Sequence, residues 1–260
     1  MKEDGALVKR PRMERRKRKN PSFFTEEERS LFLEQFPTIE DFNPDSKDNE
    51  VIFGLFCRFC FLTGCRLGEA GALTWDCVRD ASKQVLFNKV IADTANKLQM
   101  QDGLKSQEYR VFPVNAQLKE LLSLLQQYRH ILGRHYNLDI RDPAPVRKAS
   151  DWNLFTATHP IEKDFRDKEV GSRKLELVFP LFTRKRFYFN LKTYQLCWKK
   201  KLEEANLPYR KPYSTRHTFI SSCLEKGIPV NDIAKWVGNS PTVIYKNYAS
   251  SLIAKEVPEL

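Results

Sequence analysis

The segment that decides the fold runs from Tyr213 to Tyr248 and reads YSTRHTFISSCLEKGIPVNDIAKWVGNSPTVIYKNY. It opens with an arginine, Arg216, at the start of an apolar helix that ends at a glycine. A second short helix follows, and then a Gly-Asn turn and a pair of tyrosines. The pattern predicts short helices joined by tight turns. Alone, such a segment could be a binding element, so its role depends on what the rest of the chain supplies.

A dense basic segment lies near the N-terminus. The stretch from Lys9 to Lys19 (KRPRMERRKRK) holds eight basic residues and one acid, so it carries +7 of the formal net charge of +11. A block of like charge repels itself, and residues 1–20 are therefore predicted to form a solvated arm or linker. We expect nucleic-acid phosphates to bind it. The basic residues are Lys9, Arg10, Arg12, Arg15, Arg16, Lys17, Arg18 and Lys19. A solubilising tail or a nuclear-import signal is the alternative.

The composition is that of a folded domain, with 41% hydrophobic and 12% aromatic residues among 260. No apolar run is long enough to span a membrane, and we expect no membrane partner. Cys57 and Cys60 have a C-x-x-C spacing, but they lie within the apolar run VIFGLFCRFCFLTG. Buried core thiols are therefore favoured over zinc ligands. Free thiols fit a reducing compartment, so a cytoplasmic protein is expected, associated with the nucleoid in a prokaryote.

Helices dominate the N-terminal half. Thr25 and Glu28 have the spacing of a capping box, and residues 49–62 predict a strongly apolar core helix. A second helix with one buried side is expected after Gly64. At its start Arg66 and Glu69 are three residues apart, so they share a helix face and can pair. A surface ion pair of little energetic weight is the alternative.

A small sheet is expected in the middle of the chain. The runs 85–92 and 109–113 are rich in β-branched and aromatic residues, and a polar, Gly-containing connection joins them. They predict a hairpin or small sheet, with Lys105 near the turn or the start of the second strand. Residues 115–132 then predict an amphipathic helix that Gly133 would end.

The remaining pattern completes a mainly helical chain. Residues 134–176 are expected to form an elaborated surface loop with short elements, and an amphipathic helix is expected near 187–205. The fold class is therefore mainly α with a small antiparallel β-sheet (α+β). A single domain over residues 21–260 is predicted to follow the arm.

Two sequence boxes in the first half carry a resemblance to a known family. The words T-G-x-R-x-x-E and A-L-x-W-D resemble the first box of the tyrosine recombinases (phage integrases). The family's first catalytic arginine then falls on Arg66, with Glu69 as the acid that orients it. The family's hairpin lysine falls on Lys105, which stands eight residues before a strand-ending proline. Lys89 and Lys97 are competing lysines that fit less well.

The second half supplies the other two boxes. The family's H-x-x-R box is similar to Tyr213-Ser214-Thr215-Arg216, and its L-G-H box to Val237-Gly238-Asn239. The family's nucleophilic tyrosine then falls on Tyr248, nine positions after Asn239, and Tyr245 is a nearby decoy. The resemblance spans about residues 20–255 and implies the tyrosine recombinase catalytic fold.

The resemblance implies a specific chemistry. Tyr248 would attack a DNA phosphodiester to form a 3′-phosphotyrosyl intermediate, Arg66 and Arg216 would clamp the nonbridging oxygens, and Lys105 would protonate the departing 5′ oxygen. No metal and no nucleotide cofactor is implied. The expected function is a site-specific recombinase or integrase acting on double-stranded DNA.

Two positions depart from the family pattern, because Tyr213 and Asn239 stand where histidines are usual. Both keep hydrogen-bond donors, but neither can act as a proton carrier near neutral pH, as a histidine can. His217 follows Arg216 directly, and we interpret it as a helix-start residue. The hypothesis from sequence is therefore an active enzyme without a histidine general base.

Length is a further departure, since the family normally carries an N-terminal core-binding domain and only the basic arm precedes the catalytic part here. The chain is either a fragment or a short recombinase. The tail 249–260 is expected to dock on a neighbouring protomer in a tetramer on DNA, as the family's tails do, or to pack on its own domain. Two rival functions remain open: a type IB topoisomerase-like enzyme, and a catalytically impaired DNA-binding accessory module.

Overall fold

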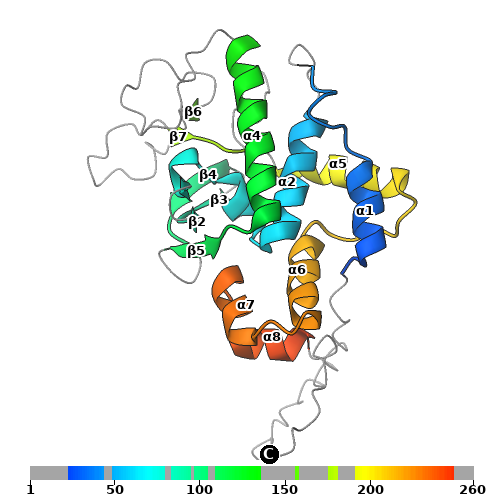
Figure 1. The fold of residues 1–260 in the computed structure, drawn as a ribbon, viewed down its shortest axis with the longest axis vertical. Coiled ribbons are helices and arrows are strands. Elements are labelled where there is room, and N and C mark those ends of the chain that lie inside the picture. The colour runs from blue at the N-terminus through cyan, green and yellow to red at the C-terminus, as the bar shows by residue number, and fades with distance from the viewer. Residues whose placement is uncertain are drawn as a thin grey trace, which may run out of the picture.

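The computed structural model describes residues 23–43, 49–79, 83–94, 97–104, 109–135, 156–157, 175–180 and 191–248. This part of the chain is mainly helical, with small antiparallel sheets beside the helices (Figure 1). The helices are α1 (Glu26–Glu34), α2 (Glu50–Thr63), α3 (Leu67–Gly71), the 3-10 turn η1 (Trp75–Cys77), α4 (Ala116–His135), α5 (Leu191–Glu204), α6 (Ser214–Glu225), α7 (Val230–Val237) and α8 (Pro241–Tyr248). The strands are β1 (Val78–Arg79), β2 (Gln84–Phe87), β3 (Lys89–Thr94), β4 (Lys97–Asp102), β5 (Arg110–Pro113), β6 (Thr156–Ala157) and β7 (Leu175–Glu176).

Helix α2 is the centre of the core, as its apolar sequence predicts. Phe56 and Phe59 are fully buried and pack edge-on against Phe179, with ring centroids 5.2 and 5.3 Å apart. Cys57 and Cys60 lie on the buried surface of the same helix, which confirms their interpretation as core thiols. Burying each large aromatic ring stabilises the fold by about 1.5–3 kcal/mol, so this helix anchors its neighbours.

The N-terminal helix begins where the capping box predicts. The Thr25 hydroxyl accepts a bond from the Glu28 backbone N–H, and the Glu28 carboxylate accepts one from the Thr25 N–H. Phe32 on α1 packs against Trp198 on α5, with ring centroids 4.5 Å apart. The cap and this one aromatic face fix α1 against the main core.

The sheet differs from the expected hairpin. The predicted strand 85–92 breaks at Asn88 into β2 and β3, and the two halves pair with different partners. β2 pairs with β5, as the register Gln84↔Pro113 shows, while β3 and β4 form a hairpin of their own inside the expected connection. The carbonyl of Asn88 accepts a bond from the Gly103 N–H at 2.7 Å, which closes the base of that hairpin.

Helix α4 ends later than its sequence predicts, and helix α5 lies where a helix is expected. Helix α4 continues through Gly133 to His135, so the predicted stop is wrong. Four buried leucines, Leu118, Leu121, Leu122 and Leu125, hold α4 in the core, and one glycine costs a helix only about 1 kcal/mol. Helix α5 confirms the helix expected near 187–205. Within 134–176 the short strands β6 and β7 are present, and most of the other residues of that range lie outside the described part.

The three C-terminal helices pack around a small core of their own. Ile220, Ile233, Val237 and Ile244 are its most buried members, and Tyr248 also belongs to it. Figure 1 shows α6, α7 and α8 gathered at one end of the molecule, next to the end of α2. The predicted succession of short helices and tight turns from Tyr213 to Tyr248 is thus confirmed.

Gly64 joins α2 to the C-terminal helices. It ends α2 in the left-handed region, at φ +58°. A Cβ atom at this position would lie 2.4 Å from a ring carbon of Phe219 on α6. Only glycine therefore permits both the turn and the close approach of α6, and this approach brings Arg216 to the Gly64 carbonyl.

Candidate active site

A buried carboxylate, Glu69, holds two arginines. Its Oε1 atom accepts a bond from Arg66 Nη1 at 2.7 Å, and its Oε2 atom accepts one from Arg110 Nη2 at 2.8 Å. The predicted pairing of Arg66 with Glu69 is confirmed. The alternative of a weak surface ion pair is wrong, because the Glu69 side chain is only 1% exposed. Burial alone would raise the pKa of Glu69, but Arg110 and Arg66 outweigh it and hold the pKa below its ordinary value.

Arg110 is a site residue that the sequence analysis missed. Its side chain is 2% exposed, its guanidinium lies 4.5 Å from the Phe87 ring centroid, and it is the first residue of β5. A signal for it exists in the sequence. Arg110 and Phe112 share the inward face of one strand, so a charge occupies a core-facing position and requires a buried partner.

Arg216 on α6 is buried more completely than Arg66. Its Nη1 atom donates to the carbonyls of Gly64 at 2.9 Å and Val237 at 2.6 Å. Its Nη2 atom is buried and has no hydrogen-bond partner among the described residues. Burial lowers the pKa of Arg216 from its ordinary value, with further lowering by the neighbouring arginines. A buried donor without a partner marks a place where an anion would be strongly held.

The C-terminal end of α7 gathers all three guanidiniums. The Val237 carbonyl accepts bonds from Arg110 and Arg216, and the Gly238 carbonyl accepts one from Arg66 Nη2 at 3.0 Å. Gly238 adopts a left-handed conformation at φ 64°, which ends α7 and leaves its last carbonyls without helical partners. These carbonyls carry the negative end of the helix dipole, so they attract cations.

Tyr248 lies inside this neighbourhood, and Tyr245 does not. The Tyr248 side chain closes α8 and is 4% exposed, whereas Tyr245 is 52% exposed one helical turn earlier. Burial raises the pKa of the Tyr248 phenol well above its ordinary value, Tyr213 adds to this, and Arg216 acts in the opposite direction. The decoy tyrosine therefore faces solvent, whereas the predicted nucleophile is buried and lies close enough to Arg216 to be affected by its charge.

A histidine contacts the phenol of Tyr248. His217 Nδ1 lies 2.5 Å from Tyr248 Oη, and the two ring centroids are 5.6 Å apart. Burial and the neighbouring Arg216 lower the pKa of His217 below its ordinary value, which favours the neutral imidazole near neutral pH. The interpretation of His217 as a helix-start residue accounts for its place in α6 but overlooks this contact.

The residues at the two positions of departure lie near the site without bonding to Tyr248. Tyr213 is 41% exposed, and its ring packs edge-on against His217 with centroids 5.2 Å apart. The Asn239 side chain is half-buried and accepts a bond from the Ser240 N–H at 3.1 Å.

Several predicted residues lie outside the described part of the chain. They are Lys105, the basic arm from Lys9 to Lys19 and the tail 249–260. The rival lysine Lys89 is buried, and its Nζ atom donates to Asn88 Oδ1 at 3.1 Å beside Thr74 and Cys77. The Lys89 ammonium group therefore contacts neutral side chains in the core, and none of these is a candidate site residue.

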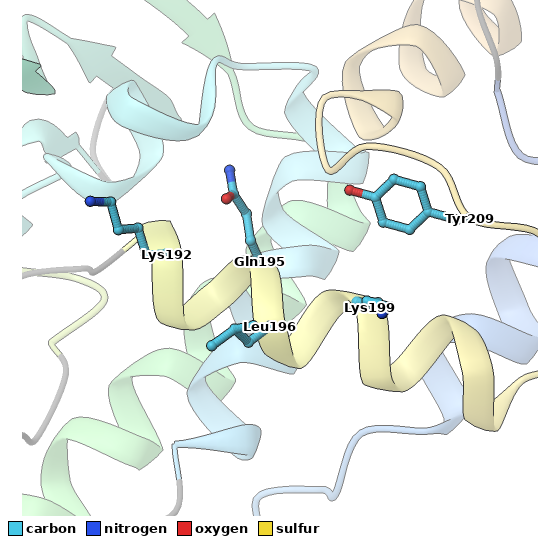
Figure 2. Close-up of a pocket in the computed structure, with 5 residues that line it drawn as sticks. All are labelled: Lys192, Gln195, Leu196, Lys199 and Tyr209. Atoms are coloured by element: carbon cyan, nitrogen blue, oxygen red, sulfur yellow. The ribbon is translucent and has the colours of Figure 1, made fainter.

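An open surface groove on α5 is separate from these residues. Figure 2 shows its lining, in which the ring of Tyr209 faces the helix. The lining residues are Lys192, Gln195, Leu196, Lys199 and Tyr209. The groove has no candidate catalytic residue in its lining. Among the described residues, no helix is both long and apolar enough to cross a membrane.

Solved structures of recombinases share this fold. An integrase of the Tn1549 transposon, solved in complex with a circular intermediate DNA, matches with a TM-score of 0.59 and 12% identity over 89% of this chain. The XerH site-specific recombinase bound to its difH substrate matches with a TM-score of 0.52 and 15% identity, again over 89% of this chain. The fold is thus that of the tyrosine recombinase catalytic domain. The chain covers 62% of the transposon integrase chain and 50% of the XerH chain.

Sequence comparison identifies the family. Residues 25–254 match the phage integrase family, so the chain belongs to that family. A curated relative from Caldanaerobacter subterraneus subsp. tengcongensis, described as tyrosine recombinase XerC-like, is 36% identical over 66 residues. That match covers 25% of this chain and 16% of the relative. The resemblance drawn from the four sequence boxes is confirmed at the level of family and fold.

Proposed function

We propose that the protein is a tyrosine-type site-specific DNA recombinase that cleaves and rejoins DNA through a 3′-phosphotyrosyl intermediate. One observation carries the proposal. Arg66 and Arg216 meet at the end of α7, where Arg216 has a buried donor with no partner in the described part of the chain, and its charge opposes the rise in the pKa of the buried Tyr248 phenol. Transfer of a phosphodiester to a tyrosine requires a nucleophilic phenol and cationic donors that hold the phosphate oxygens.

The attack transfers the phosphoryl group to the protein. The Tyr248 oxygen forms a bond to phosphorus while the bond from phosphorus to the DNA 5′ oxygen breaks, so no net bond energy has to come from a cofactor. The phosphorane-like state carries extra charge on its nonbridging oxygens. Arg66 and Arg216 are proposed to donate to those oxygens, and removing one such donor costs about 3–4 kcal/mol in comparable sites. Religation reverses these steps and releases Tyr248.

The departing 5′ oxygen needs a proton. Lys105 is proposed to supply it, because an ammonium group can act as the general acid for a departing alkoxide. Tyr213 and Asn239 are proposed to donate further hydrogen bonds to the phosphate oxygens. Glu69 orients Arg66 and does not contact the substrate in this scheme.

Double-stranded DNA is the proposed substrate. The arm from Lys9 to Lys19 would bind backbone phosphates and release counterions, which gives affinity without sequence selection. The tail 249–260 is proposed to dock on a neighbouring protomer, so that four copies assemble on paired sites. A DNA substrate would place the protein in the cytoplasm, at the nucleoid in a prokaryote.

Covalent trapping tests the proposal. The full chain is incubated with sheared genomic DNA from its source organism and with supercoiled plasmid, and the reaction is stopped with detergent. Protein–DNA adducts are recovered, and the attached DNA is sequenced to give the cleaved site. We expect an adduct with the wild type, none with Tyr248→Phe, and an undiminished one with the matched control Tyr245→Phe.

The same experiment separates the rival functions. Exchange of strands between two duplexes that carry the trapped site supports a recombinase. Relaxation of supercoils by isolated monomers without strand exchange supports a type IB topoisomerase-like enzyme. DNA binding with no adduct under any of these conditions supports an accessory module and refutes the proposal.

A further inference from the structure

The contact between His217 and Tyr248 has no counterpart among the four sequence boxes. His217 lies in the first turn of α6 and Tyr248 is the last residue of α8, so 31 positions separate them. Their close approach at 2.5 Å joins a ring nitrogen to the phenolic oxygen; Tyr248 belongs to the small C-terminal core, and His217 is half-buried beside it.

We infer that His217 is the general base of this enzyme, accepting the proton of Tyr248 at Nδ1 as the phenol attacks phosphorus. The inference rests on the proposed function, and it replaces the expectation of an enzyme without a histidine base. Geometry is the first requirement for such a base, and hydrogen-bond contact with the attacking oxygen meets it.

The surrounding charges favour transfer of the proton from Tyr248 to His217. The titratable and charged groups against the His217 ring are Arg216 and Tyr213, at the start of its own helix, and Tyr248 on α8. Arg66, Glu69 and Arg110, from α3 and β5, surround Arg216 in turn. Because burial and the positive charge of Arg216 both disfavour an imidazolium and lower the pKa of His217, the ring is neutral near neutral pH and its Nδ1 can accept. The Nε2 atom then carries the ring proton.

The phenol of Tyr248 requires a general base. Burial raises the pKa of Tyr248, and the opposing effect of Arg216 does not cancel that rise. Near neutral pH the phenol is therefore protonated, and an attack without a base would leave a proton on a bridging oxygen. The residues at the two positions of departure, Tyr213 and Asn239, make no hydrogen bond to Tyr248 among the described residues, whereas His217 does.

The step balances without a further reactant. As the bond from Tyr248 oxygen to phosphorus forms, the proton passes from that oxygen to His217 Nδ1, and the 5′ oxygen leaves with a proton from the general acid. The negative charge that develops on the phosphate compensates Arg216, so the imidazolium costs less in the transition state than in the free enzyme. In religation the imidazolium returns its proton to the departing phenol.

Replacing the leaving oxygen by sulfur isolates this step. The substrate is a duplex carrying the trapped site with a 5′-bridging phosphorothiolate, whose thiolate departs without being protonated. Adduct formation is followed in single-turnover reactions between pH 5 and 9 with the wild type, His217→Asn and Lys105→Ala. Asparagine keeps a hydrogen-bond acceptor near the position of Nδ1 but cannot take a proton. Urea unfolding and filter binding of DNA establish that His217→Asn is folded and binds normally.

The wild-type rate is expected to fall as the pH drops through a midpoint below 6.5, where His217 becomes protonated. His217→Asn should lose this midpoint and react roughly 10²–10⁴-fold more slowly at pH 7. The sulfur substrate should restore Lys105→Ala and leave His217→Asn slow, because the two residues act on opposite sides of phosphorus.

Retention of the midpoint in His217→Asn, or a rate within threefold of the wild type, overturns the inference while leaving the recombinase proposal intact. A wild-type rate that does not change between pH 5 and 7 also overturns the inference, and this result does not depend on whether His217→Asn folds. Absence of any adduct with the wild type on both the oxygen and sulfur substrates refutes the proposed function itself.

Discussion

Substituting Arg110 by methionine tests whether the buried arginine positions the site. The change removes one partner of a pair whose side chains are 2% and 1% exposed, together with the donor to the Val237 carbonyl. Breaking a buried pair from one side costs roughly 3–5 kcal/mol. Glu69 keeps Arg66, and a thioether can still pack on the Phe87 ring, so we expect a loss near the lower end, about 3 kcal/mol.

Equilibrium unfolding in urea measures this loss. A destabilisation of that size should lower the midpoint of thermal unfolding by about 6–12 °C for a chain of this length. The matched control is Arg29→Met, which breaks the exposed pair of Arg29 with Glu26, where the side chains are 28% and 78% exposed. The control should cost no more than about 1 kcal/mol.

The pH dependence of the free energy of unfolding is a second test of the pair formed by Glu69 and Arg110. The folded-state pKa of Glu69 is lowered, so its contribution to stability is present above its unfolded value of 4.5 and is lost as the pH falls through the folded pKa. The difference between wild type and Arg110→Met should therefore narrow in acid below pH 4.5. A loss equal to that of Arg29→Met, or a difference independent of pH, would refute the role assigned to Arg110.

Three further outcomes are expected. Arg216→Lys should slow adduct formation roughly 10²–10³-fold while DNA binding in a filter assay changes little, because lysine keeps the charge but not the planar donors. Gly64→Ala should cost about 1–3 kcal/mol in urea unfolding, since the added methyl meets Phe219 and φ is +58°. The raised pKa of Tyr248 contributes stability that is present below its unfolded value of 10.0 and falls as the pH rises above it, so Tyr248→Phe should make the alkaline loss shallower.

Local patterns were predictable where one physical rule decides them. The capping box at Thr25, the apolar helix α2 and the pair of Arg66 with Glu69 each depend on residues three or four positions apart. The four boxes predicted the family because their order fixes which helices meet. Spacing alone did not reveal that Glu69 is buried, which depends on Arg110, 41 positions away.

The misses have a common cause in tertiary contacts. The strand 85–92 breaks at Asn88 because its two halves pair with different partners, a choice that β propensity cannot express. Gly133 fails to end α4 because the leucine face of that helix remains packed. His217 stands at a helix start by sequence, and its contact with Tyr248 exists only once α8 folds back on α6.

In the proposed mechanism, the residues at the end of α7 would become reactive only when the substrate is bound. Three guanidiniums converge there on two carbonyls and one carboxylate, so positive charge exceeds negative charge, and burial together with the neighbouring Arg66 and Arg110 lowers the pKa of Arg216. A DNA phosphate would bring the missing negative charge to the unpartnered Nη2 of Arg216. Its arrival also makes protonation of His217 easier, because Arg216 is the charge that opposes it. In the proposed mechanism, binding of the phosphodiester and deprotonation of Tyr248 would therefore be coupled through Arg216, so that the phenol is activated when the bond it attacks is in place.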